Sequence, residues 1–145
     1  MSGLVDSNIL LYAVNTDSAE HPRAYDFLTS SLAGSDAWYL TEGIVYEFLR
    51  LGTHAGAFER PLSWDQALRF VRTLYNRDNV SVLSAGVDHW STLAATLPQL
   101  RYAVGDQFVD IRSYVLMREH GVRTIYTANP AFRQLEDIRV VNPLL

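Results

Sequence analysis

A repeated alternation of short apolar runs with amphipathic helical segments is the feature of this sequence that most limits its possible folds. The apolar runs, which we interpret as strands, are residues 3–5, 38–40, 80–83, 124–126 and 139–141. The segments predicted to be helical are 9–14, one that begins near Pro22, one that Thr41 caps, 63–75, 87–97, one that ends at His120, and a short turn at 130–135. Because such alternation favours parallel strands with helices on both faces, we expect a three-layer α/β/α sandwich around a short, mainly parallel sheet.

Individual residues indicate where several of these helices begin and end. Ser63 and Gln66 have the spacing of a capping box at a helix start. Pro98 is expected to end the helix before it, and Gly121 suits a helix C-terminus. The last long helix is defined by apolar residues at helical spacing, which we expect to face the core: Val104, Phe108, Ile111 and Val115.

Length and composition are typical of a folded chain with a single domain, which we expect to span residues 1–145. The absence of cysteine excludes disulfides and cysteine nucleophiles. The apolar N-terminal segment carries Asp6 and no leading basic residues, so it is unlike a signal peptide, and we expect a cytoplasmic protein. The net charge of −4 argues against nucleic-acid binding through a broad basic surface, so any nucleic acid must be held locally.

Several oxygen-bearing side chains are predicted to lie near the carboxyl ends of the strands. Asp6 directly follows the first strand, Glu47 lies on the helix after the second, and Asn129 follows the fourth. Asp106 and Asp110 are four residues apart and therefore share one face of a helix. Ligands of open parallel sheets bind at this edge, and carboxylates there could hold a hard cation such as Mg²⁺ or Mn²⁺.

Such a carboxylate cluster suits the cleavage of a phosphodiester bond. That reaction needs neutralisation of the phosphate charge, an activated water and a stabilised leaving oxygen, all of which bound divalent cations supply. Without a cation, clustered carboxylates would repel and raise one another's pKa. The sequence therefore favours a metal-dependent hydrolase over a site built from side chains alone.

Each acid also has a purely structural interpretation. Asp6 can cap the helix that follows it. Glu47 can pair with Arg50 one turn later, and Asp106 can interact with the dipole of its own helix. Other catalytic sites have less support, because the sequence has no phosphate-binding glycine-rich loop, no G-x-S-x-G and no H-E-x-x-H, and its four histidines are too isolated to suggest zinc.

Nearly the whole chain resembles the PIN-domain ribonucleases, and specifically the VapC-like toxins of bacterial and archaeal toxin–antitoxin pairs. The order and spacing of the matching segments are more specific than any one of them. These segments are VDSNILLYA at the N-terminus, VYEFLR around Glu47, DIRSYVLMREHG from Asp110, TIYTANPAF from Thr124, and the closing VVNPL.

The resemblance implies an endoribonuclease that uses Mg²⁺ or Mn²⁺ and a metal-activated water. It places the three metal-binding acids of the family at Asp6, Glu47 and Asp110, which makes Asp106 a weaker candidate. The residues expected to support these ligands without binding metal are Ser7, Asn8, Thr127 and Asp106. It also implies a homodimer and a small antitoxin protein that occludes the site.

Asn129 is the one clear departure from the family pattern, which usually has an acid there and often another at the position of Ala131. We keep Asn129 as a candidate catalytic residue, because an amide oxygen can still bind a cation or its water. It adds no negative charge, so we expect weaker binding of a second cation and a gain in metal affinity in Asn129→Asp.

Two alternatives follow from the same residues. The chain could be a catalytically weakened PIN-like module that binds RNA or a protein partner without cleaving, for which Asn129 is the only hint. It could also be a nuclease that acts on DNA, because none of the candidate residues distinguishes DNA from RNA.

Overall fold

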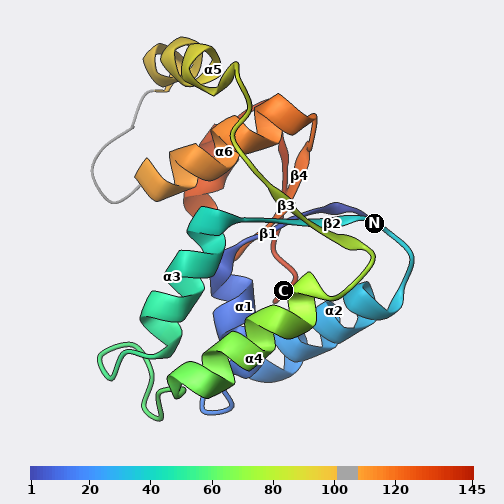
Figure 1. Ribbon diagram of the computed structural model, residues 1–145, viewed down its shortest axis with the longest axis vertical. Helices are drawn as coiled ribbons and strands as arrows, with labels where there is room; N and C mark the ends of the chain where they lie inside the picture. Colours follow the sequence, from blue (N-terminus) through green and yellow to red (C-terminus); the bar gives the residue numbers. More distant parts are fainter. Residues whose placement is uncertain (101–107) are drawn as a thin grey trace.

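The computed structural model of the protein describes residues 1–100 and 108–145 (Figure 1). Val104 and Asp106, for which the sequence suggested a buried and a supporting role, lie outside these residues. No helix in the described ranges is both long and apolar enough to cross a membrane.

A five-stranded, entirely parallel sheet forms the centre of the fold, as the sequence predicted. Its strands are β1 (Gly3–Val5), β2 (Trp38–Thr41), β3 (Val80–Leu83), β4 (Thr124–Tyr126) and β5 (Arg139–Val141). Their spatial order is β3-β2-β1-β4-β5, so the first strand of the chain occupies the middle of the sheet. The carboxyl end of β1 is therefore flanked by the ends of β2 and β4.

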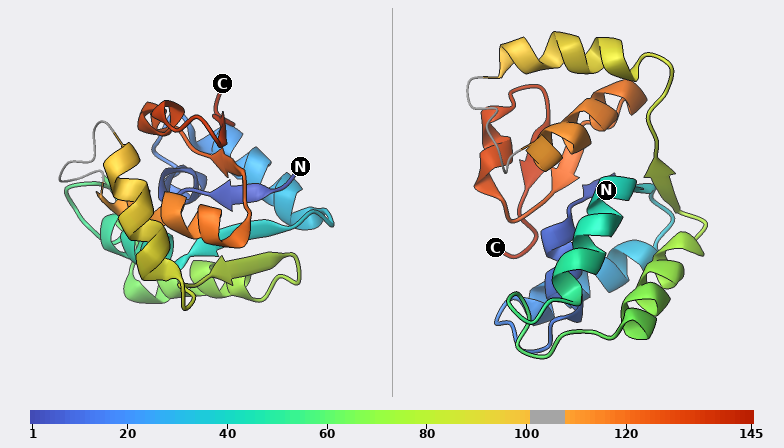
Figure 2. Two further views of the ribbon diagram at one scale, coloured as in Figure 1. Left: turned by 90° about the horizontal axis from the view of Figure 1, so that it is seen from above. Right: turned by 60° about the vertical axis from the view of Figure 1, so that its left-hand side comes forward.

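Helices cover both faces of the sheet, which confirms the three-layer prediction. The helices are α1 (Ser7–Val14), α2 (His21–Ala33), α3 (Glu42–Gly52), α4 (Trp64–Tyr75), α5 (His89–Thr96) and α6 (Phe108–His120), with 3₁₀ helices η1 (Leu97–Gln99) and η3 (Pro130–Gln134). Figures 1 and 2 show α1, α2 and α4 on one side of the sheet and α5 and α6 on the other. α3 begins where β2 ends and contacts α1, α4 and α6, so it joins the two helical layers.

Local hydrogen bonds explain several of these boundaries. The Thr41 hydroxyl accepts the backbone N–H of Ile44 at 3.1 Å and so fixes the start of α3 directly after β2. Ser63 and Gln66 form the predicted capping box at α4. Gly121 ends α6 with a φ of 68°, a left-handed conformation that suits glycine and that lets the Val122 N–H reach the Met117 carbonyl at 2.9 Å.

Two details of the predicted helices differ in the structure. The helix expected over 87–97 is shorter, because α5 covers His89–Thr96 and Pro98 lies in the following turn η1. The prediction that Phe108 faces the core is wrong: its side chain is 50% exposed, whereas Ile111 and Val115 are buried. Phe108 is the first residue of α6.

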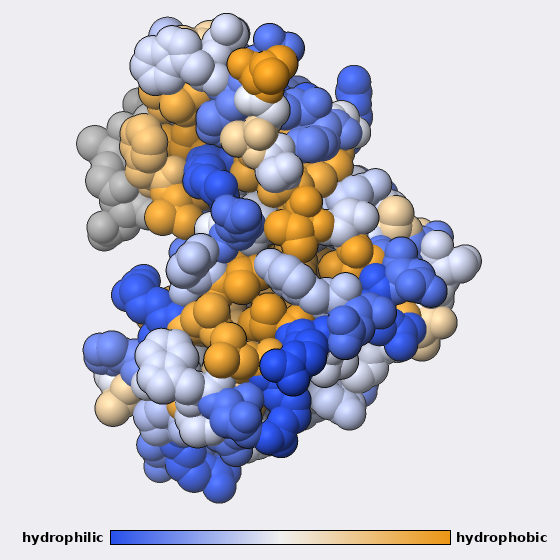
Figure 3. All heavy atoms as spheres, in the orientation of Figure 1, coloured by the Kyte–Doolittle hydropathy of each residue, from blue (hydrophilic) through white to orange (hydrophobic). Residues whose placement is uncertain are grey.

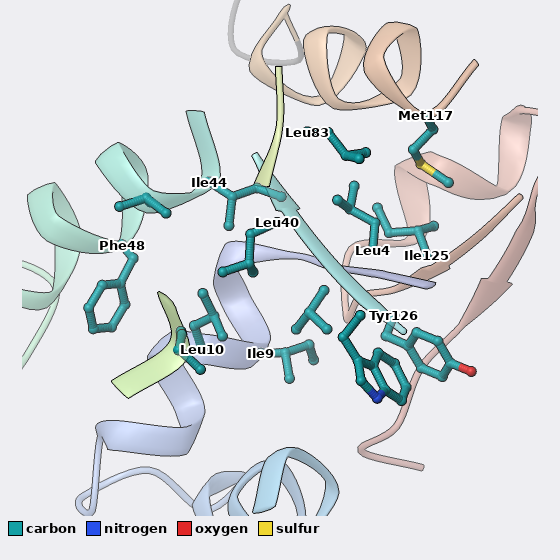
Figure 4. Close-up of a cluster of buried hydrophobic side chains, with 14 of the residues drawn as sticks. Leu4, Ile9, Leu10, Leu40, Ile44, Phe48, Leu83, Met117, Ile125 and Tyr126 are labelled. Carbon is teal, nitrogen blue, oxygen red and sulfur yellow. The ribbon is translucent and has the colours of Figure 1, made fainter. Parts of the chain in front are cut away.

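The hydrophobic core fills both sides of the sheet (Figure 4). Leu4 and Ile125 lie near Met117 of α6, whereas Ile9 and Leu10 of α1 pack on the opposite face. Because β1 is buried on both faces, it is apolar without alternation, as central parallel strands are. This packing holds the carboxyl end of β1, where Asp6 lies, in a fixed position.

Candidate active site

Asp6 lies at the junction between the central strand and the first helix. Its backbone N–H donates to the Tyr126 carbonyl at 3.0 Å, which continues the β1–β4 pairing, and its Oδ1 accepts the Ser7 N–H at 2.8 Å as the N-cap of α1. The side chain is only 5% exposed. Asp6 is therefore the N-cap of α1, as the purely structural interpretation proposed. It also lies at the carboxyl edge of the sheet, where the sequence predicted a metal ligand.

Two neighbours hold the second oxygen of Asp6. The Thr127 hydroxyl donates to Asp6 Oδ2 at 2.8 Å, and the Asn8 amide donates to the same oxygen at 3.1 Å. The Asn8 amide is oriented by the N–H of Ala128, which donates to Asn8 Oδ1 at 3.0 Å and so turns the amide nitrogen toward Asp6. Asn8 and Thr127 thus hold the side chain of Asp6 through hydrogen bonds.

Glu47 approaches the same region from α3. Its Oε1 accepts the hydroxyl of Ser7 at 2.9 Å, which connects α3 to the start of α1. Glu47 makes no ion pair with Arg50 or with any other residue of the described chain. The alternative that Glu47 is only a partner for Arg50 is therefore not what the structure shows.

Asp110 lies in the first turn of α6 and is bound to Asn129. The Asn129 Nδ2 donates to Asp110 Oδ2 at 2.9 Å, while Asn129 Oδ1 accepts the N–H of Ala131 at 3.0 Å and caps η3. Because a backbone N–H needs an acceptor, this second bond fixes which way the amide points. Asn129 therefore directs its amide NH₂ group toward Asp110. Its side-chain oxygen accepts the Ala131 N–H instead.

The three carboxylates influence one another electrostatically. Burial raises the pKa of Asp110 to about 7, with further increases from the negative charges of Asp6 and Glu47. Burial likewise raises the pKa of Asp6, against the opposing effect of the hydrogen bonds from Thr127 and Ser7. Burial and mutual repulsion both disfavour the charged forms of these carboxylates. A cation bound between them would stabilise the charged forms.

The donor set suits a divalent cation, although its geometry does not yet surround one. Oxygen ligands from three acids are what Mg²⁺ and Mn²⁺ prefer, and a cation would offset the burial and the like charges that raise the pKa of Asp110. In the described ranges, no three His, Cys, Asp or Glu side chains lie close enough together to share one metal ion. A shared ion would therefore require at least one carboxylate to change rotamer.

Sequence reasoning identified most of this cluster. The described residues that the structure connects by hydrogen bonds are Asp6, Ser7, Asn8, Glu47, Asp110, Thr127 and Asn129. They form one network, because the Asn129 N–H donates to Thr127 Oγ1 at 3.0 Å and so joins the Asp110–Asn129 pair to the group around Asp6 and Glu47.

Comparison with known proteins agrees with this fold. The PIN domain family matches residues 3–138. Ribonuclease VapC37 of Mycobacterium tuberculosis is 30% identical over 141 residues, which cover 97% of this chain and 96% of that protein.

Two solved structures share the fold across the whole chain. The crystal structure of VapC20, a sarcin-ricin loop cleaving toxin of Mycobacterium tuberculosis, superposes with a TM-score of 0.70 at 17% identity and covers 98% of this chain and all of that one. VapBC-1 from nontypeable Haemophilus influenzae has a TM-score of 0.65 at 19% identity and covers all of both chains.

Proposed function

Because the chain belongs to the PIN-domain family and to its VapC branch, we propose that it is a metal-dependent endoribonuclease, the toxin of a toxin–antitoxin pair. The observation that carries this proposal is the buried carboxylate Asp6, which three donors hold at the centre of the sheet edge while the charges of Glu47 and Asp110 act on the same region. Ribonuclease VapC37, which matches over almost its full length, is named for RNA cleavage.

Asp6, Glu47 and Asp110 are the residues that would hold Mg²⁺ or Mn²⁺. When bound, a divalent cation supplies charge neutralisation at the phosphate and lowers the pKa of a water. The chain itself contributes the positions of the ligands: Thr127 and Asn8 restrict Asp6, and Ser7 restricts Glu47. Asp110, which has a single side-chain hydrogen bond to the described residues, is the ligand that we expect to move when the cation binds.

Asn129 is the residue on which the alternative of a weakened module depends. Its amide donates to Asp110 rather than repelling it, so it stabilises the carboxylates when no cation is present. We expect one cation to bind more tightly than a second, and we expect cleavage to survive. The retention of all three acids at the sheet edge favours a nuclease over a binding module.

The decisive experiment is cleavage of a mixed RNA pool by the purified protein with Mg²⁺ or Mn²⁺, and again with chelator. We expect cleavage that requires the metal and that falls by about a hundredfold or more in Asp6→Asn, which keeps the shape but removes the charge. Asp26→Asn is the matched control, since Asp26 is exposed on α2 and makes no ion pair in the described chain.

Three other outcomes would change the assignment. Cleavage only by Asn129→Asp would identify a disabled nuclease. Equal cleavage of DNA of the same sequence would remove the restriction to RNA. A folded protein that binds RNA and never cuts it, with any metal, would favour the binding module.

Helix α4 offers a contact surface for the proposed antitoxin partner. Trp64, Leu68 and Tyr75 are large hydrophobic residues at helical spacing that remain exposed on this helix. An apolar helix or extended segment of a small protein would cover them. Co-expression with the product of the adjacent reading frame should yield a complex that Leu68→Arg weakens, and a complex that is insensitive to Leu68 would place the partner elsewhere.

A further inference from the structure

The connection between β4 and β5, residues 127–138, carries two of the side chains that hold the candidate metal ligands. The Thr127 hydroxyl donates to Asp6, and the Asn129 amide donates to Asp110. The Asn129 N–H also donates to Thr127 Oγ1 at 3.0 Å, which joins the two bonds into one unit. The position of Asp6 relative to Asp110 therefore depends on how this connection lies against α6.

The middle of the β4–β5 connection is anchored in the hydrophobic core. Phe132 of η3 is 1% exposed, and Leu135 is 9% exposed. Apolar contacts are not directional, so polar contacts at the two ends must fix how the connection is aligned along α6. Asn129 makes such a contact near one end, and Asp137 makes one near the other.

α6 meets the two ends of the connection with one face. Asp110, Tyr114 and Arg118 are four residues apart and therefore share this face, on which Asp110 pairs with Asn129. The Tyr114 hydroxyl donates to Asp137 Oδ1, and Arg118 Nε lies 3.9 Å from Asp137 Oδ2. This face is polar, whereas Figure 3 shows hydrophobic surface between α5 and α6.

The bond from Tyr114 to Asp137 has a fixed direction and a supported acceptor. Burial, together with the bond to Asp137, raises the pKa of Tyr114 to about 12, so the hydroxyl keeps its proton at neutral pH and donates it. The Arg118 guanidinium lies over the Tyr114 ring, 5.6 Å from the centroid, and its Nη1 donates to Thr96 and Gln99 at 3.3 Å. Arg118 thus keeps a positive charge beside the Asp137 carboxylate.

This bond matters most when a cation binds. A shared ion requires a carboxylate to change rotamer, and Asp110 is the ligand that we expect to move, at the expense of its bond from Asn129. The bond between Tyr114 and Asp137 is one turn further along α6 and involves no metal ligand, so it can persist. It then keeps the connection, which carries Thr127, aligned with α6.

We propose that Tyr114 is a positioning residue of the metal site, which acts through Asp137 to hold the β4–β5 connection against α6 while Asp110 turns toward the cation. The inference rests on the proposed function and adds a residue that touches neither metal nor RNA. Loss of the hydroxyl should cost little in the metal-free protein, because the Asp137 side chain is half-exposed and water can replace the donor. It should cost more when the cation binds.

The test is Tyr114→Phe, which keeps the buried ring and removes only the hydroxyl. Calorimetric titration should show Mn²⁺ binding weakened by about fivefold. Hydrogen exchange at saturating Mn²⁺ should be faster in peptides within residues 127–138 and unchanged elsewhere. Tyr39→Phe is the matched control, since it removes a hydroxyl from β2, outside α6 and this connection, and it should equal the wild type in both measurements.

A double-mutant cycle shows whether Tyr114 acts through Asp137. Asp137→Ala should weaken Mn²⁺ binding by at least the same factor, and Tyr114→Phe added to it should change the affinity no further. A full additional loss in the double variant would show that Tyr114 acts on the site in another way, and the proposal would be wrong. A lower Tm in chelator with unchanged Mn²⁺ affinity would show that the bond only supports the fold, which would also overturn it.

The outcomes distinguish this inference from the proposed function. If Tyr114→Phe loses Mn²⁺ affinity as expected but the wild type cleaves no RNA, the positioning role stands and the ribonuclease assignment fails. If the wild type cleaves RNA and Tyr114→Phe binds Mn²⁺ as tightly as it does, the inference fails and the assignment stands. If the wild type neither binds Mn²⁺ nor cleaves RNA, both are wrong.

Discussion

Asp6 and Asp110 belong to one site, but their surroundings give them different freedom. Asp6 accepts bonds from Ser7, Asn8 and Thr127, which hold both of its oxygens. Among residues 1–100 and 108–145, Asp110 accepts one side-chain bond, from Asn129. The rigid carboxylate is therefore the fixed point of the site, and burial with the charges of Asp6 and Glu47 raises the pKa of the less restrained Asp110 to about 7.

This raised pKa predicts how stability depends on pH in chelator. Because the pKa of Asp110 is raised to about 7 in the folded state, the folded protein binds more protons than the unfolded chain between about pH 4 and 7, and its stability falls as pH rises through this range. Asp110→Asn removes the titrating group, so its Tm should exceed that of the wild type at pH 8 and match it near pH 3.5. Thermal melts at both pH values check this, and an Asn variant that is less stable at pH 8 would contradict it.

Asn129→Asp should have opposite effects with and without metal. In chelator the new carboxylate replaces a donor 2.9 Å from Asp110, so the variant should melt at a lower temperature than the wild type. With Mn²⁺ the added negative charge should raise metal affinity. Calorimetric titration of both proteins measures this, and identical metal affinities would show that residue 129 does not contribute to the site.

At the scale of elements, helix termini place the site residues. The contribution of one terminus to stability can be measured at Gly121, where α6 ends. Gly121 has a left-handed conformation, and no atom lies within 4 Å of the position that a Cβ would occupy there, so a methyl group would meet no obstruction. Gly121→Ala should therefore lose about 1 to 2 kcal/mol from backbone strain alone. Gly34→Ala, after α2 with an ordinary negative φ, is the control for denaturant melts and should be nearly neutral.

The elements were predictable from sequence where their signals were local. The Ser63–Gln66 capping box, the Thr41 cap and Gly121 act within a few residues, and the structure has all of them. The pattern failed at Phe108, because helical spacing alone does not show which apolar positions of a helix are covered by other elements.

In the candidate site, too, features with a local sequence signal were predictable, and features that depend on contacts in the folded chain were not. Acids directly after apolar strands were predictable, because parallel strands bring their carboxyl ends to one edge. The donor role of Asn129 toward Asp110 was not, because it depends on the bond between Asn129 Oδ1 and the N–H of Ala131.

At the scale of the whole molecule, cation binding should stabilise the fold, because the proposed ligands come from three separate parts of the chain. A metal at a hundred times its Kd adds about 2.7 kcal/mol, which raises the Tm by about 5–10 °C for a chain of this size. Melts with Mn²⁺ and with chelator measure the shift, and Asp6→Asn should abolish it. A shift of equal size in Asp6→Asn would show that the metal binds elsewhere.

The central position of β1 has a consequence for the chain while it is being made. β1 pairs with β4, and the carboxylate that follows β1 accepts a bond from Thr127, 121 residues later in the sequence. During synthesis the chain can assemble α1, α2 and β2 early, but it has no partner for the other edge of β1 until β4 has been made. A translation product that stops before Thr127 lacks β4 and one of the three donors to Asp6, so we expect such a fragment to have no nuclease activity.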